Sequence, residues 1–149
     1  MKNTTKILVL FFVTFIASSC FKKIKEDLIP SGSATLIANG TNVSLGTPTA
    51  VTLLGVVTIE ANKDKSGYTI LLNKSDIKEG KKYDLKSSTG VFTFLHDGTY
   101  YSPSTGTLEI MKFTDNKIVE GKFSFDGNAV GSTSKKMTAS GTFSVNIIL

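Results

Sequence analysis

The chain has 149 residues and a formal net charge of +5, with one Cys, one His and no Trp. All 17 basic residues are Lys, so Arg is absent. This length is typical of a single domain. One Cys excludes an intramolecular disulfide framework and a cysteine-cluster metal site, and the lack of Arg removes the side chain that binds phosphate in a bidentate fashion. We therefore expect neither a metal nor another cofactor.

The N-terminal segment predicts export from the cytoplasm. Lys2 and Lys6 precede an apolar run over residues 7–17, which Thr14 alone interrupts, and small residues follow it. A basic start, an apolar stretch and a small-residue cleavage site are typical of a secretory signal peptide. A membrane-spanning helix needs about 18 or more apolar residues. A retained transmembrane helix is therefore the weaker interpretation.

The only cysteine follows this run in the sequence Ala17-Ser18-Ser19-Cys20, which resembles a bacterial lipobox. The resemblance implies that the Cys20 thiol receives a diacylglycerol, that the chain is cut before Cys20 and that the new amine is acylated. Two or three acyl chains anchor a protein stably in a membrane, whereas one is marginal. The alternative is an ordinary signal peptide with an incidental cysteine. We expect a lipoprotein signal peptide over residues 1–19, a lipidated tether over 20–33 and an all-β domain over 34–149.

The residues after Cys20 bear on localisation and partners. Phe21 stands where Asp would retain a Gram-negative lipoprotein in the inner membrane, so we expect an outer-membrane anchor. Lys25-Glu26-Asp27 loosely resembles a surface-export signal, which leaves both the periplasmic face and the cell surface open. Cleavage before Cys20 lowers the net charge from +5 to +3. We expect the membrane as a partner through the lipid anchor. Because the lysines are scattered, we expect no nucleic acid as a partner.

Alternation of apolar and polar residues dominates the chain after Ser33 and predicts strands. Asn39-Gly40 and Asp97-Gly98 each lie between two such stretches and are strong signals for two-residue hairpin turns. Residues 73–80 could hold one helical turn, capped by Ser75 or Asp76. The predicted strands cover residues 34–38, 41–45, 51–61, 68–72, 83–86, 91–96, 99–102, 107–113, 117–125 and 137–149.

Strand faces can be predicted from the same alternation. In residues 137–149 apolar residues and glycines alternate with polar ones, which indicates a half-buried strand. Gly121 and Gly141 fall on inward faces, where they suggest bends or bulges. One face of the stretch 51–61 is predicted to carry Val51, Leu53, Gly55, Val57, Ile59 and Ala61. Nine or ten strands, mostly joined to the next along the chain, predict an all-β antiparallel meander that hides its edges as a flattened β-barrel or a β-sandwich.

The C-terminal region also shows a family resemblance. Residues 104–126 contain a Gly-Thr, strand, turn and strand pattern that ends in Gly-Lys-Phe-Ser-Phe, and residues 138–147 contain a closing Gly-Thr-Phe strand. This pattern resembles a family of β-rich bacterial lipoproteins that is catalogued as a domain of unknown function. The resemblance implies an anchored all-β domain over about residues 33–149. It implies no catalytic residue.

The sequence contains no clear catalytic pattern. His96 adjoins the predicted Asp97-Gly98 turn, and no Gly-x-Ser-x-Gly segment supplies a nucleophile for it, so we expect an exposed turn histidine. The acidic residues are spread over turns and outward strand positions, as on a solvated β surface. Asp126-Gly127-Asn128 lacks the spacing of a calcium loop. We therefore predict no catalytic residues and no metal site, and expect that the protein is not an enzyme.

Two adjacent tyrosines are the candidate ligand-binding residues. Neighbouring residues of a strand face opposite sides, so we expect one of Tyr100 and Tyr101 in the core and the other exposed. An exposed tyrosine beside a loop is a common contact for carbohydrate or protein, although a rim aromatic that covers the barrel end is an alternative. We expect a lipid-anchored binding or interaction module of the cell envelope. The other candidates are a lipocalin-like carrier with a hollow apolar interior and a hydrolase with converging carboxylates.

Overall fold

The structure is a computed structural model and describes residues 31–86, 92–115 and 117–148. Except for one 3-10 turn at Lys74–Asp76, its regular elements are strands, as predicted. The predicted turn forms, but no side chain caps it, so neither Ser75 nor Asp76 has the expected role. The strands are β1 (Gly32–Ala38), β2 (Thr41–Asn42), β3 (Thr49–Leu53), β4 (Val56–Lys63), β5 (Ser66–Asn73), β6 (Lys82–Asp84), β7 (Phe92–His96), β8 (Thr99–Thr114), β9 (Ile118–Ala129) and β10 (Lys136–Ile148).

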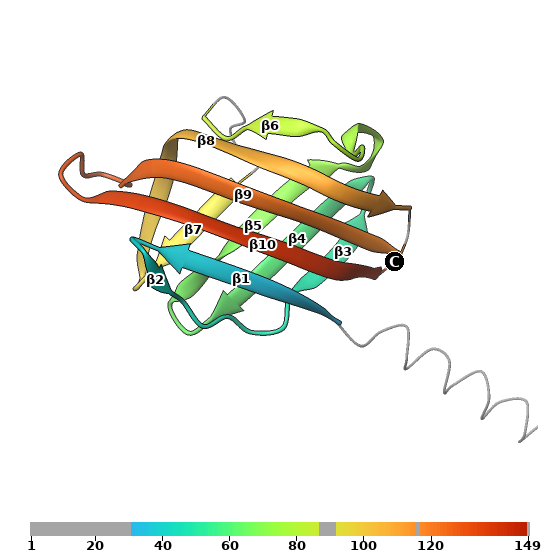
Figure 1. Cartoon of the computed structure of the whole chain (residues 1–149), viewed down its shortest axis with the longest axis horizontal. Coiled ribbons are helices and arrows are strands. Elements are labelled where there is room, and N and C mark those ends of the chain that lie inside the picture. Colours follow the sequence, from blue (N-terminus) through green and yellow to red (C-terminus); the bar gives the residue numbers. More distant parts are fainter. Residues whose placement is uncertain (1–30, 87–91, 116, 149) are drawn as a thin grey trace, which may run out of the picture.

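Seven of these strands form a closed ring, in the order β3, β4, β5, β7, β8, β9 and β10. Each strand is antiparallel to its neighbours except at the closure, where β10 pairs in parallel with β3. β1 shares the same edge of β10 with β3, and β6 pairs with β8. Figure 1 shows the ring flattened into two layers, with β1, β10, β9 and β8 in front of β3, β4, β5 and β7. The predicted all-β fold, a flattened barrel or a sandwich, is confirmed, and the parallel closure of the ring is a departure from a simple meander.

β8 joins the two layers as one bent strand of 16 residues. The sequence predicted two strands here, because Ser102-Pro103-Ser104 suggests a loop, and that prediction is wrong. The register shifts between Pro103 and Thr105, and again between Ile110 and Lys112, so each interval holds a β-bulge. A bulge bends a strand and tolerates a proline without a break in the sheet. β8 therefore passes from β7 in one layer to β6 and β9 in the other (Figure 1).

The predicted strand 51–61 is a hairpin. Leu54 and Gly55 have φ values of 50° and 79° and form the turn between β3 and β4. The hairpin pairs Leu53 with Val56, so odd-numbered residues of β3 share a face with even-numbered residues of β4. Val51 and Leu53 therefore point outward, 43% and 70% exposed, and Gly55 lies in the turn rather than inside. The odd-numbered residues are apolar on both sides of the turn, which suggested one continuous strand face. Because the turn has two residues, the odd-numbered residues of β3 and those of β4 lie on opposite faces of the sheet.

Aromatic rings fill the interior between the layers. The rings of Tyr68, Phe92, Phe94, Phe123 and Phe125 have centroids 4.8–6.5 Å apart in successive pairs. Such pairs add to the stabilisation that comes from burying the rings. The inward alternation predicted for β10 is confirmed from Met137 to Ile147. The turns at Asn39-Gly40 and Asp97-Gly98 are also confirmed, whereas β1 begins at Gly32, two residues before the expected boundary.

Candidate functional site

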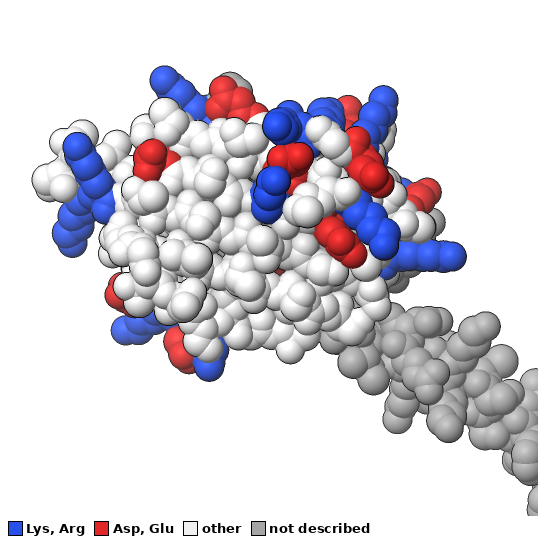
Figure 2. Space-filling model, viewed as in Figure 1, with Lys and Arg blue, Asp and Glu red and all other residues white. Residues whose placement is uncertain are grey.

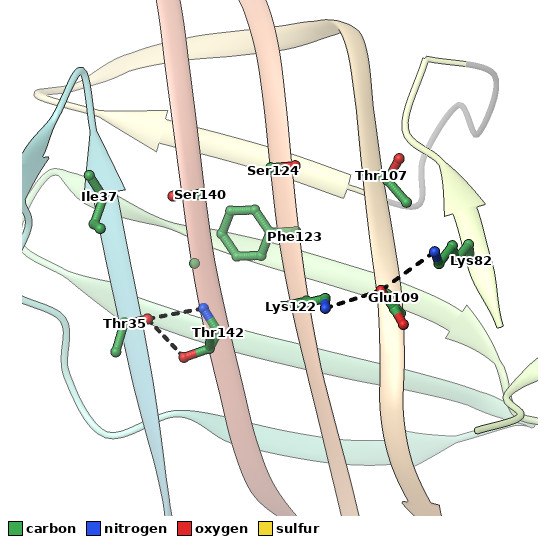
Figure 3. Close-up of a pocket in the computed structure, with 11 residues that line it drawn as sticks. Thr35, Ile37, Lys82, Thr107, Glu109, Lys122, Phe123, Ser124, Ser140 and Thr142 are labelled. Carbon is green, nitrogen blue, oxygen red and sulfur yellow. Dashed lines mark hydrogen bonds and ion pairs between the residues drawn. The ribbon is translucent and has the colours of Figure 1, made fainter. Parts of the chain in front are cut away.

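Two grooves open on the outer surface of the barrel. The first, which we name the sheet groove, crosses the front layer over β1, β10, β9, β8 and β6 and has a volume of about 520 Å³ (Figure 3). The Phe123 ring lies at its floor, where Gly141 opposite it has no side chain. The lining residues are Thr35, Ile37, Lys82, Thr107, Glu109, Lys122, Phe123, Ser124, Ser140, Gly141 and Thr142.

Several polar side chains of the sheet groove are paired with one another. The Glu109 carboxylate lies 3.3 Å from Lys122 Nζ and 3.9 Å from Lys82 Nζ. The hydroxyl oxygens of Thr35 and Thr142 are 2.8 Å apart. Figure 2 shows a wide area without charged side chains on the same face, over β1 and β10. A ligand in this groove would have to compete with the existing pairs, so the groove is the weaker candidate.

The second groove, the tyrosine groove, contains both predicted tyrosines and has a volume of about 590 Å³. Tyr100 points outward and is 56% exposed. Tyr101 is half-buried, with its ring centroid 6.2 Å from that of Phe94. The two adjacent tyrosines thus face opposite sides of the sheet, as predicted. The other lining residues, none of them charged, are Phe92, Thr93, Gly98, Thr99, Ser102, Pro103 and Val130.

The tyrosine groove and the start of the domain lie at opposite ends of β10. Val130 precedes β10, and its N–H donates to the Tyr100 carbonyl at 2.9 Å. At the far end of the strand, the Asn146 N–H donates to the Ser31 carbonyl at 3.0 Å. The 13 residues of β10 correspond to roughly 40 Å of extended chain. Figure 1 shows the connection before β10 and its C-terminal end at opposite ends of the molecule.

His96 belongs to a polar cluster that the sequence did not predict. Its Nδ1 is 3.3 Å from Ser66 Oγ, and its Nε2 is 3.6 Å from a carboxylate oxygen of Asp97. The His96 side chain is 23% exposed, so the expected exposed turn histidine is half-buried. The reason is that the turn after β4 packs against the turn after β7, where the Gly98 N–H donates to the Lys65 carbonyl at 2.9 Å.

The cluster brings Ser, His and Asp together, but its geometry is that of a structural contact. Ser66 is 8% exposed, so a substrate would have little access to its hydroxyl. The same oxygen accepts a hydrogen bond from the Asp97 N–H at 3.1 Å. We interpret the cluster as a link between two hairpins. Ser66 and His96 are 30 residues apart in the chain, so no local sequence pattern could have revealed it.

Neither a cluster of metal-binding side chains nor a membrane-spanning helix occurs in the described residues. Over residues 31–86, 92–115 and 117–148, no three His, Cys, Asp or Glu side chains lie together as a metal ion would require. Nor does this part of the chain contain a helix with the length and hydropathy needed to span a membrane. The predicted signal peptide and Cys20 lie outside the described residues.

Comparison with known proteins adds no family assignment. No family model matches the chain, and the search of curated proteins finds no match. The functional interpretation therefore rests on the sequence motifs, the fold and the grooves.

Proposed function

We propose that the chain is a lipoprotein of the bacterial cell envelope, anchored in the outer membrane through Cys20, whose β domain binds a ligand and is not an enzyme. The segment Ala17-Ser18-Ser19-Cys20 after an apolar run supports the lipid anchor. Phe21 supports retention in the outer membrane. The resemblance of residues 104–147 to β-rich lipoproteins supports the same combination of an anchor and an all-β domain.

The observation that carries the binding role is the position of the tyrosine groove. Ser31, the first residue that the structure describes, lies next to the end of β10, and the groove with Tyr100 lies beside the start of that strand. An anchor attached through Ser31 would hold that end towards the membrane. The exposed Tyr100 ring would then face away from the bilayer, where an extracytoplasmic ligand can reach it. This arrangement suits a module that presents its site to soluble or cell-wall molecules.

The chemistry of the groove favours a carbohydrate over a protein partner. Tyr100 offers an exposed aromatic face, on which the apolar face of a sugar ring can stack. Thr93, Thr99 and Ser102 bring hydroxyl groups to the same groove, and each hydroxyl can both donate and accept a hydrogen bond. No charged side chain lines the groove. A neutral, polyhydroxylated ligand therefore fits better than a charged one.

The alternative of a lipocalin-like carrier has less support. A carrier needs a hollow interior of about 300 Å³ or more. The interior of this barrel is occupied by aromatic rings in mutual contact. The sheet groove opens on the outer surface, and the tyrosine groove meets the interior only at Phe92 and Tyr101. The binding module is therefore the preferred function.

The anchor is tested by Cys20→Ser. Because the thiol is the proposed acceptor of the lipid, we expect the variant to lose palmitate labelling and to leave the membrane fraction for the soluble one. Wild-type chain expressed at the same level is the control. Palmitate labelling that persists in Cys20→Ser contradicts the proposal.

Ligand binding is tested by Tyr100→Ala on an array of bacterial envelope glycans. Loss of a base stacked on an aromatic ring removes about 1–3 kcal/mol. If a stacked sugar ring contributes a similar amount, we expect the affinity for the bound glycan to fall by about 5- to 150-fold. Ile37→Ala, which removes an exposed apolar side chain at the sheet groove, is the matched control. Equal loss in both variants, or none in Tyr100→Ala, argues against the tyrosine groove.

A further inference from the structure

The hairpin of β3 and β4 carries an exposed apolar surface. Leu54 at its turn is 95% exposed and Leu53 is 70% exposed. Val56 pairs with Leu53, and Val51 pairs with Ile148 on the neighbouring strand, so apolar side chains continue across the outward face. We name the residues Leu53, Leu54 and Val56 the apolar tip. Exposed apolar side chains that gather in one place mark contact sites for proteins or membranes.

Leu54 has no evident role in the fold. Its φ of 50° is unfavourable for a bulky residue. Within residues 31–86, 92–115 and 117–148, the other residues besides glycine with positive φ are Asn39, Asp64 and Asp97, whose short polar side chains tolerate this conformation. At 95% exposure, Leu54 gains almost no burial in return. A strained, solvent-exposed leucine at a turn points to a contact outside the domain.

The apolar tip lies at the end of the barrel where the described chain begins. Ser31 contacts Asn146, and two residues later Ile148 pairs with Val51 of β3. Because β3 runs parallel to β10, Leu53 lies about four residues, or roughly 13 Å, beyond Ser31 along the strand direction. Figure 1 shows β3 and the C-terminal end of β10 at the same end of the molecule. The tip therefore projects past the point where the N-terminal segment enters the domain.

The length of the N-terminal segment keeps this end close to the anchor. From Cys20 to Pro30 there are eleven residues, which span at most about 40 Å when fully extended. The neighbouring turn contributes Lys117, which is exposed, and Asp115, which is paired with Lys74 at 2.9 Å. The charges of Lys117, Asp115 and Lys74 thus do not disfavour the approach of this end of the domain to phospholipid headgroups.

We propose that the apolar tip inserts into the surface of the lipid bilayer that holds the Cys20 anchor. This inference rests on the proposed lipid anchor and adds a second, non-covalent contact to it. The anchor supplies proximity, and insertion of Leu53 and Leu54 fixes the orientation of the domain. The tyrosine groove at the other end of β10 is then held away from the membrane.

The absence of tryptophan from the chain allows a direct test. Leu54→Trp places a single tryptophan at the tip of the full-length, lipidated protein, at a position where exposure leaves room for it. Thr133→Trp places one in the exposed turn before β10, at the opposite end, and is the matched control. Both proteins are reconstituted into phosphatidylethanolamine and phosphatidylglycerol vesicles with or without brominated acyl chains. Palmitate content and co-sedimentation with the vesicles are measured on the same samples.

We expect the emission of Leu54→Trp to be blue-shifted relative to Thr133→Trp and to be lost in brominated vesicles, while Thr133→Trp emission is retained. Anchored protein with equal emission from both variants overturns the inference and leaves the anchor intact. A blue shift without bromine quenching also overturns it, because a second copy or another protein then covers the tip. Protein without palmitate that fails to co-sediment overturns the anchor, and with it this inference.

Discussion

Tyr68 is the most deeply buried tyrosine and illustrates how a single side chain links the two layers. It lies on β5, is 1% exposed, and its hydroxyl donates to the Thr142 carbonyl of β10 at 3.2 Å. Its ring packs edge-to-face against that of Phe123, with 4.8 Å between the centroids. Burial raises the pKa of Tyr68 well above its ordinary value. The folded state therefore keeps this proton at a pH where the unfolded chain loses it.

The sign of the resulting pH dependence follows from that difference. Below about pH 10 the folded and the unfolded states both hold the Tyr68 proton, so the free energy of unfolding keeps its full value. Above about pH 10 the unfolded state releases the proton first, and the free energy of unfolding falls by up to about 1.4 kcal/mol per pH unit. Tyr68→Phe lacks this effect but loses a hydrogen bond worth about 1 kcal/mol. We expect the wild type to be the more stable protein at pH 7–9 and to lose that advantage near pH 11. Urea unfolding across this range checks the prediction.

The pKa of Tyr83 is also raised, by burial and by the charge of Asp76. Both proteins retain Tyr83, so its effect cancels in the comparison. A stability difference between wild type and Tyr68→Phe that stays constant from pH 7 to pH 11 would contradict the assignment to Tyr68.

At the scale of single residues, the sequence predicted which positions of β10 point inward, because period-two alternation depends on nothing beyond strand geometry. It could not place His96 beside Ser66, since that contact depends on how two hairpins pack. It predicted that Tyr100 and Tyr101 face opposite sides, but the groove around them also needs Val130 from a turn 30 residues away.

At the scale of elements, β9 and β10 are matched by reciprocal pairs of glycine and phenylalanine. Gly121 pairs with Phe143, and Gly141 pairs with Phe123. A methyl group on Gly141 would lie 2.7 Å from Phe123 Cζ and would collide with the Thr35 carbonyl oxygen. The sequence suggested bends or bulges at these glycines, and the second register shift of β8 does begin opposite Gly121. Both glycines also make room for the ring on the opposite strand.

We expect Gly141→Ala to destabilise the domain by about 1–3 kcal/mol, the usual range for an overpacked core. Ser140→Ala, on the outward side of the same strand, is the control and should change stability by less than about 0.5 kcal/mol. Chemical denaturation measures both. Phe123→Leu shortens the opposing side chain. The double variant Gly141→Ala/Phe123→Leu should therefore be more stable than the sum of the two single losses in the free energy of unfolding indicates. Strict additivity would argue against the contact with Phe123 as the cause and would leave the collision with the Thr35 carbonyl oxygen as the explanation.

The two elements that the sequence mispredicted share a cause. In β8 a proline and two serines suggested a loop, and a bulge instead keeps one strand continuous. In the β3–β4 hairpin no Asn or Asp announced the turn, so Leu54-Gly55 was taken as strand interior. Bulges and turns that lack their usual residues are set by the partners across the sheet, which a single sequence does not contain. Length, alternation and the Asn-Gly and Asp-Gly turns sufficed for the fold class.

At the scale of the whole molecule, a short contact closes the ring. β10 meets β3 through Ile147 opposite Ala50 and Ile148 opposite Val51. Ile147 is 8% exposed and packs in the core, whereas the Ile148 side chain lies on the outward face. Two residues at the end of one strand therefore complete the barrel.

Deletion of residues 147–149 removes this closure and one buried isoleucine, so we expect a loss of at least about 3 kcal/mol in the free energy of unfolding. Hydrogen exchange should increase first at the backbone amides of β3. Ile148→Thr, which keeps the strand pairing and changes the outward side chain, should remain within about 1 kcal/mol of the wild type. Equal stability of the deletion variant and the wild type would show that the contact between β3 and β10 is dispensable.

The pairing partners of β10 also set the order in which the fold can assemble. β1 and β3 both depend on β10, and the pairing of Thr35 with Thr142 spans 107 residues of chain. Contacts between distant parts of a chain slow folding, because the loop between them must close first. β1 cannot reach its longer partner, and β3 cannot close the ring, until β10 has been synthesised. The last strand therefore closes the ring, whereas the hairpins of β1 with β2 and of β3 with β4 can form before it.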